Sequence, residues 1–234
     1  MFYDSQPLPG RVWAGLFRAT IVSMIETIII VLIIVFVSMV LHEIVHGAVA
    51  LALGDDTAKS DGRLTLNPIK HIDPIMTLLV PLLLAVSGGP IFGGAKPVPI
   101  NPYQLKWKEW GMALVAIAGP ATNFVIAFIF VACLAIISPE YGGFWDGFLK
   151  MGFMVNMGFC IFNLIPIPPL DGSRVIYAIA PDGVRKFMAS IERFGIIIVF
   201  AIIILFGSLF SQLIWGGMQG VYDMYSGMFH LTPL

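Results

Sequence analysis

The chain has 234 residues and a formal net charge of −1, with 58% hydrophobic and 12% charged residues. Soluble domains average about 25% charged residues, so this composition excludes an ordinary soluble domain and indicates an integral membrane protein. The near-neutral charge, without any basic stripe interleaved with aromatic residues, excludes nucleic acid as an expected partner.

Charged residues divide the chain into uncharged intervals, each a candidate membrane segment. In chain order these are residues 27–41 with a continuation to 54, then 74–95, 110–139, 151–170 and 194–222. Spanning about 30 Å of hydrocarbon takes about 20 helical residues, so all but the second predict full transmembrane helices, four in total. The second contains Pro81 and several Gly-Gly pairs, and its short apolar part is expected to be re-entrant or packed in a protein groove.

Residues 42–46, His-Glu-Ile-Val-His, form an HExxH motif within the first apolar interval. On a helix this spacing puts His42 and His46 about 6 Å apart on one face, with the Glu43 carboxylate beside any metal that they hold. An ionisable group at bilayer depth costs roughly 2.5–3.5 kcal/mol on insertion scales, and a bound metal compensates for such a cluster. A chance match on an ordinary helix is the alternative, but the apolar surroundings favour a metal site.

Zinc in catalytic sites commonly takes three protein ligands plus water, so HExxH leaves one ligand to find. Asp171 is the best candidate, because the proline-rich stretch before it stops a helix and Gly172 permits unusual backbone conformations. An interfacial acid or a helix cap explains Asp171 equally well from spacing alone. Three other residues could serve as the third ligand, but each lies in a charged loop, where a solvent-exposed side chain is the simpler explanation: His71, Asp73 and Glu109.

The distribution of lysine and arginine predicts the topology. If residues 74–95 do not cross the membrane, ten of the 13 lysine and arginine residues lie on one face, which the positive-inside rule makes cytoplasmic. The same scheme returns Asp171 to the leaflet where the HExxH span ends. We expect residues 1–234 to form a single membrane domain, all-α and polytopic.

Together, these motifs resemble the site-2 protease family of intramembrane zinc metalloproteases. The resemblance rests on the HExxH motif, on residues 163–172 as N-x-x-P-x-P-P-L-D-G, and on residues 119–123 as G-P-x-x-N. Residues 54–55, 62–68 and 95–99 are similar to the compact bacterial and archaeal members. The resemblance implies one zinc ion per chain bound by His42, His46 and Asp171, with Glu43 as the catalytic general base.

It also implies a substrate that is a transmembrane or membrane-anchored protein, and a prokaryotic cell membrane with the active site open to the cytoplasm. Asn123 and Asn163 match motif positions, and the resemblance suggests that they hold the substrate backbone near the metal. Hydrogen bonding between helices is the alternative for both. Asn156 matches no motif position and is expected to form hydrogen bonds between helices.

Residues 63–67 and 96–100 are predicted to be short extended segments near the active site, able to pair with an unwound substrate or to form a plain loop hairpin. Two other functions remain open. Intramembrane histidine and aspartate also line ion pathways, so a divalent-metal transporter or metal-regulated membrane protein is the alternative. The second is a binding or chaperone-like protein that keeps the fold without catalysing hydrolysis, although no residue argues for it.

Overall fold

The structure, a computed structural model, describes residues 10–74, 95–231 and 234, with the backbone alone for residues 10–24, 196 and 210. Its regular elements within this part are all helices, so the predicted all-α class is confirmed. The predicted short extended segments do not become strands there: residues 63–67 and 96–100 follow irregular paths. Residues 75–94 lie outside the described part, and with them the predicted re-entrant segment.

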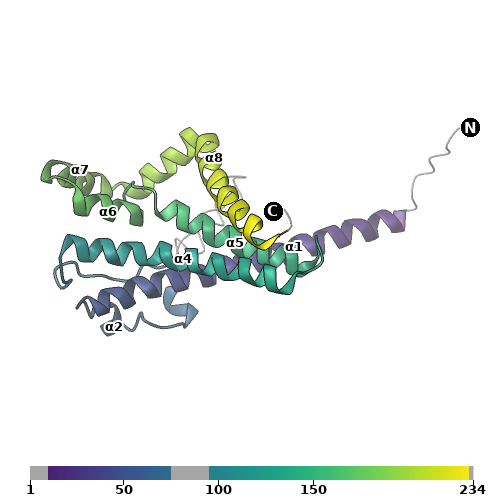
Figure 1. Cartoon of the computed structure of the whole chain (residues 1–234), viewed down its shortest axis with the longest axis horizontal. Coiled ribbons are helices and arrows are strands. Elements are labelled where there is room, and N and C mark those ends of the chain that lie inside the picture. Colours follow the sequence, from purple (N-terminus) through teal and green to yellow (C-terminus); the bar gives the residue numbers. More distant parts are fainter. Residues whose placement is uncertain (1–9, 75–94, 232–233) are drawn as a thin grey trace, which may run out of the picture.

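Two long helices run side by side through the middle of the structure (Figure 1): α1, Gly10–Ala52, and α4, Glu109–Ile137. At 1.5 Å per residue, α1 is about 65 Å long, and its first turns extend well beyond the other elements. α1 ends before Gly54, whose φ of 106° is a conformation that glycine adopts without strain. The short helix α2, Thr57–Ser60, follows directly.

Residues Ile25–Ala52 of α1 and the whole of α4 are long and apolar enough to cross a membrane. Within the described residues, a third crossing arises only if α7, Asp182–Glu192, and residues Ile197–Leu209, which meet at an 88° bend, form one broken span. The four full crossings predicted from the uncharged intervals are therefore not confirmed. The predicted interval 151–170 begins after Lys150, whereas the helix α5, Phe144–Asn163, begins earlier and carries the buried Asp146–Lys150 ion pair in its first two turns.

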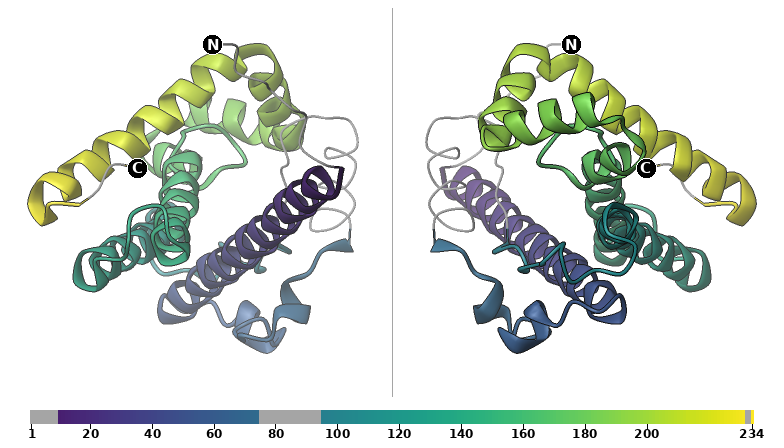
Figure 2. Two further views of the ribbon diagram at one scale, coloured as in Figure 1. Left: turned by 90° about the vertical axis from the view of Figure 1, so that its right-hand side faces the viewer. Right: turned by 90° about the vertical axis from the view of Figure 1, so that its left-hand side faces the viewer.

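α5 lies between α8, Gly195–Phe229, and the α1–α4 pair (Figure 2). α8 bends at Phe206, where φ is −123° and ψ is 25°. A hydrophobic core joins α4, α5 and α8 beyond Asn123 along α4, and includes Ala127, Val131, Leu134, Leu149, Phe153, Met157, Cys160, Met218, Tyr222 and Tyr225. This core fixes α5 against α4 and so sets the register of the polar residues on both helices.

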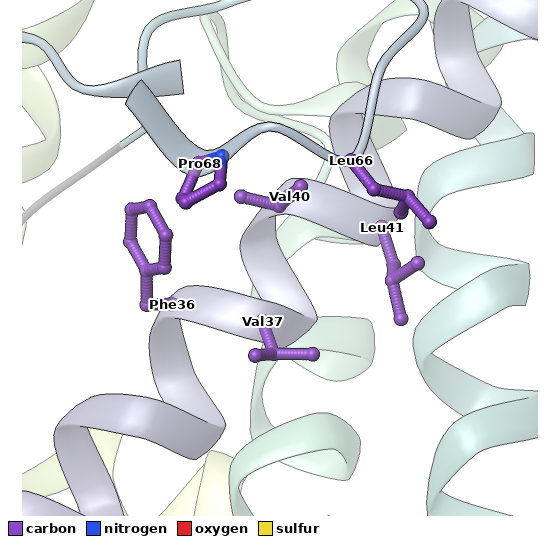
Figure 3. Close-up of a pocket in the computed structure, with 6 residues that line it drawn as sticks. All are labelled: Phe36, Val37, Val40, Leu41, Leu66 and Pro68. Atoms are coloured by element: carbon purple, nitrogen blue, oxygen red, sulfur yellow. The ribbon is translucent and has the colours of Figure 1, made fainter. Parts of the chain in front are cut away.

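Many apolar side chains of α1, α4 and α8 remain exposed, as expected for helices that face lipid. A hollow of about 370 Å³ lies between α1 and the loop that follows α2 (Figure 3), and is lined by Phe36, Val37, Val40, Leu41, Leu66 and Pro68. Val40 is two residues from His42 and so lies about 160° from it around the helix. The hollow therefore opens on the side of α1 away from the HExxH imidazoles.

Candidate metal centre

The two HExxH imidazoles lie together on the buried face of α1. His42 and His46 are one turn apart, and only 8% and 6% of their surfaces are exposed. Their rings meet edge to face with centroids 4.5 Å apart, and their Nε2 atoms are 2.9 Å from each other. The predicted spacing thus brings two ring nitrogens to one point against α4.

Hydrogen bonds to oxygen atoms of α4 determine which nitrogen of each ring carries the proton. His42 Nδ1–H donates to Asn123 Oδ1 at 2.6 Å, and His46 Nδ1–H donates to the Val115 carbonyl at 2.7 Å. Because both partners are acceptors, the proton of each neutral ring sits on Nδ1. Both Nε2 atoms then present lone pairs, and neither ring can donate a hydrogen bond to the other.

The orientation of Asn123 is set by a chain of amides that starts on α5. Asn156 Nδ2 donates to the Gly152 carbonyl at 2.9 Å, and Asn123 Nδ2 donates to Asn156 Oδ1 at 3.1 Å. Since the Gly152 carbonyl can only accept, this chain turns Asn123 Oδ1 towards His42. Both asparagines are fully buried.

The asparagines of α4 and α5 form a hydrogen bond between helices, as expected for Asn156. Protein atoms bond both the oxygen and the nitrogen of the Asn123 amide, which favours orienting His42 over holding substrate. The predicted contact of Asn123 with substrate stays a prediction. The sequence does carry a signal for Asn156, because it is a polar amide in an apolar helix, two turns before Asn163. Asn163 Nδ2 bonds the Phe159 carbonyl of its own helix, and its predicted contact with substrate stays a prediction.

Asp171 reaches the two imidazoles from the first residue of α6, Asp171–Ile179. Its Oδ2 lies 3.1 Å from His42 Nε2 and 3.4 Å from His46 Nε2. This oxygen is buried and receives no hydrogen bond. Gly172 makes the position possible, because a Cβ there would lie 2.2 Å from the Leu164 carbonyl oxygen.

The three groups fit a zinc ion. Their donor atoms form a triangle with edges of 2.9, 3.1 and 3.4 Å, close to the ~3.3 Å between neighbouring ligands of a tetrahedral zinc. Two imidazole nitrogens and one carboxylate oxygen are a donor set that zinc accepts. Two facing lone pairs and a carboxylate oxygen without a proton between them repel one another unless a cation joins them.

The rival ligands do not reach this point. Among the described residues, His42, His46 and Asp171 are the group of metal-ligating side chains that converges. His71 Nε2 instead donates to the Thr65 carbonyl, and Glu109 faces Arg185 at 3.9 Å.

Glu43, one residue after His42, lies beside the cluster. Its Oε2 accepts a hydrogen bond from the Val98 N–H at 2.8 Å, so a segment far along the chain reaches over α1 at this point. Asp55 supports the same segment, because its Oδ2 accepts from the Asn101 N–H at 2.6 Å. Burial alone would raise the pKa of Asp55, but hydrogen bonds from Thr57 and Asn101 outweigh it and hold that pKa below its usual value.

Comparison with known proteins identifies the family of the chain. The model of peptidase family M50 matches residues 140–206. YwhC of Bacillus subtilis, provisionally named a zinc metalloprotease, is 37% identical over 204 residues, which cover 82% of this chain and 89% of YwhC. The chain belongs to peptidase family M50. It is therefore a zinc-dependent metalloprotease and an integral membrane protein.

Two further relatives also carry provisional names as zinc metalloproteases. Rip2 of Mycolicibacterium smegmatis is 32% identical over 71% of this chain and 63% of its own length. A protein of Methanocaldococcus jannaschii is 32% identical over 63% of this chain and 69% of its own length. No solved structure is a significant match to the chain.

Proposed function

We propose that this M50 peptidase is an intramembrane endopeptidase that hydrolyses a peptide bond in or near the transmembrane segment of a membrane protein. In this proposal His42, His46 and Asp171 bind the zinc ion and Glu43 is the general base. The observation that supports it is that three atoms converge in one buried place. They are the two unprotonated Nε2 atoms and an Asp171 oxygen that accepts no hydrogen bond.

The depth of the cluster supports cleavage within the bilayer. His42 lies ten residues before the end of α1 at Ala52, about 15 Å along the helix axis. If Ile25–Ala52 crosses the membrane, the imidazoles lie inside the hydrocarbon layer, where a substrate helix can approach them laterally. In this proposal the end of α1 is on the cytoplasmic face, because ten of the 13 lysine and arginine residues lie on that face if residues 74–95 do not cross the membrane.

The chemistry divides between the metal and the protein. Bound zinc supplies a Lewis acid that lowers the pKa of a coordinated water to about 7 and polarises the scissile carbonyl. The Glu43 carboxylate, beside His42 in sequence, takes the proton of the attacking water and later returns it to the leaving nitrogen. Asn123 and the Val115 carbonyl hold the imidazoles with their Nε2 atoms towards the reaction.

Glu43→Gln tests this proposal against ion transport. The purified protein and this variant are placed in liposomes with a panel of single-span membrane proteins, and cleavage, zinc content and zinc flux are measured. We expect equal zinc content in both proteins, cleavage by the unaltered protein and none by the variant. Zinc flux without cleavage in either protein would support the transporter instead.

A further inference from the structure

Residues 96–101 hold the proposed general base although they form no regular element. The Val98 N–H donates to Glu43 Oε2, and the far end of the segment is tied to Asp55 through the Asn101 N–H. Such a segment carries no ladder of its own hydrogen bonds. Its position over Glu43 therefore depends on contacts from elsewhere.

Arg63 supplies contacts immediately before Val98. Its Nη2 donates to the Lys96 carbonyl at 2.6 Å and lies 3.3 Å from the Pro97 carbonyl. Only 6% of Arg63 is exposed, and among the described residues it forms no ion pair with a carboxylate. Burying a guanidinium that faces backbone carbonyls is costly, which argues for a positional role.

The loop that carries Arg63 is itself well fixed. His71, fully buried, donates from Nε2 to the Thr65 carbonyl at 2.8 Å, and its own carbonyl accepts from the Lys96 N–H at 2.8 Å. The loop of residues 63–71 thus bonds both backbone groups of Lys96: His71 accepts from its N–H, and Arg63 donates to its carbonyl. We call this loop the frame, because it fixes the backbone just before Val98.

Gly47, one turn after Glu43, lets this frame lie directly on α1. A Cβ at Gly47 would lie 2.7 Å from Leu64 Cδ2 and 2.9 Å from Val98 Cγ1. The residue after Arg63 and the residue that bonds Glu43 therefore pack against the same spot of the HExxH helix. A shift of either would change the direction from which the Val98 N–H meets the carboxylate.

We propose that Arg63 is a positioning residue for the peptidase reaction, acting through the Lys96 and Pro97 carbonyls to hold the Val98 N–H on Glu43. The inference rests on the proposed role of Glu43. Misplacing a reacting group by about 1 Å costs on the order of 100-fold in rate. Loss of Arg63 should therefore lower kcat by roughly 10- to 100-fold, with little change in KM or zinc content.

Arg63→Gln tests the inference, and Lys70→Gln is the matched control, because it removes one positive charge from an exposed side chain of the same loop. We expect the kcat loss for Arg63→Gln alone and near-complete rescue by Arg63→Lys, whose ammonium can donate to both carbonyls. A purely structural role would instead lower kcat and zinc content together. Arg63→Gln with the same kcat as Lys70→Gln would overturn the inference.

Val98→Pro is the second variant, in case Arg63→Gln does not fold. It deletes the N–H from which Glu43 accepts a hydrogen bond and replaces the Val98 side chain, between two residues that are already proline. We expect the same kcat loss with zinc retained, and unchanged kcat would overturn the inference.

Hydrogen exchange separates this inference from the proposed function, because it needs no substrate. Arg63→Gln should lower protection across residues 96–101, whereas Glu43→Gln should affect mainly the Val98 amide. If the unaltered protein cleaves nothing but these exchange changes occur, the proposed function fails and the link from Arg63 to Glu43 stands. Unchanged exchange in Arg63→Gln contradicts the link whatever the activity.

Discussion

Gly119 is the position where a single added methyl group should weaken zinc binding without unfolding the protein. It lies in α4 directly against the two imidazoles. A Cβ there would be 2.4 Å from His46 Nε2 and 2.5 Å from His42 Cε1. Ordinary contacts of a Cβ begin at about 3.4 Å, so Gly119→Ala must displace the imidazoles or α4 by about 1 Å.

The size and direction of the effect follow from two opposing contributions. Glycine to alanine inside a helix is intrinsically favourable by about 1 kcal/mol, so α4 itself should not be weakened. The new methyl group occupies the space in front of His46 Nε2, a proposed ligand atom. Disturbing the support of a metal ligand costs roughly 10- to 100-fold in affinity, and we expect at least the lower value here.

The assay is zinc affinity by competition with a chelator, beside the thermal midpoint in detergent. Gly147→Ala is the matched control, because Gly147 is helical and a Cβ there meets nothing within 4 Å. We expect zinc affinity to fall for Gly119→Ala alone, with both variants folded. Equal zinc affinity in the two variants would refute the placement of the imidazoles against α4.

Three further results are expected. Asn123→Ala removes the acceptor of His42 Nδ1 and should weaken zinc affinity or activity by roughly 10- to 100-fold; an unchanged value in the chelator assay would contradict the orienting role. Gly172→Ala puts a Cβ 2.2 Å from the Leu164 carbonyl and should abolish cleavage by displacing Asp171; wild-type turnover would argue against that ligand. Because the folded-state pKa of Asp55 is lowered, its contribution to stability is complete above the unfolded pKa of about 3.9 and is lost as the pH falls through the lower folded value. The difference in thermal midpoint between the protein and Asp55→Asn should therefore shrink below about pH 4, and a difference that grew in acid would show the sign to be wrong.

Local spacing predicted the part of the site that lies on one helix. His42 and His46 needed only the periodicity of α1 to meet. Asp171 is more than a hundred residues away, and spacing alone left it equal to a helix cap. The resemblance of residues 163–172 to a family motif, rather than any local rule, favoured it over His71, Asp73 and Glu109.

The support of the imidazoles could not be predicted in the same way. The Val115 carbonyl is a backbone atom and leaves no mark in the sequence. The contact of Asn156 with Asn123 depends on the register in which α5 packs against α4, which the hydrophobic core around Phe153 sets. The four predicted crossings are not confirmed, and the positions of charged residues do not show where a helix begins or bends. α5 begins before Asp146 and Lys150, and the chain bends before Ile197.

X-ray absorption at the zinc edge, on the purified protein and on Asp171→Ala, tests the central claim most directly. The account predicts one zinc per chain, bound by two imidazole nitrogens and by oxygen at about 2.0–2.2 Å, and a much weakened site in the variant. A sulfur ligand in the spectrum, or wild-type zinc affinity in Asp171→Ala, would contradict it.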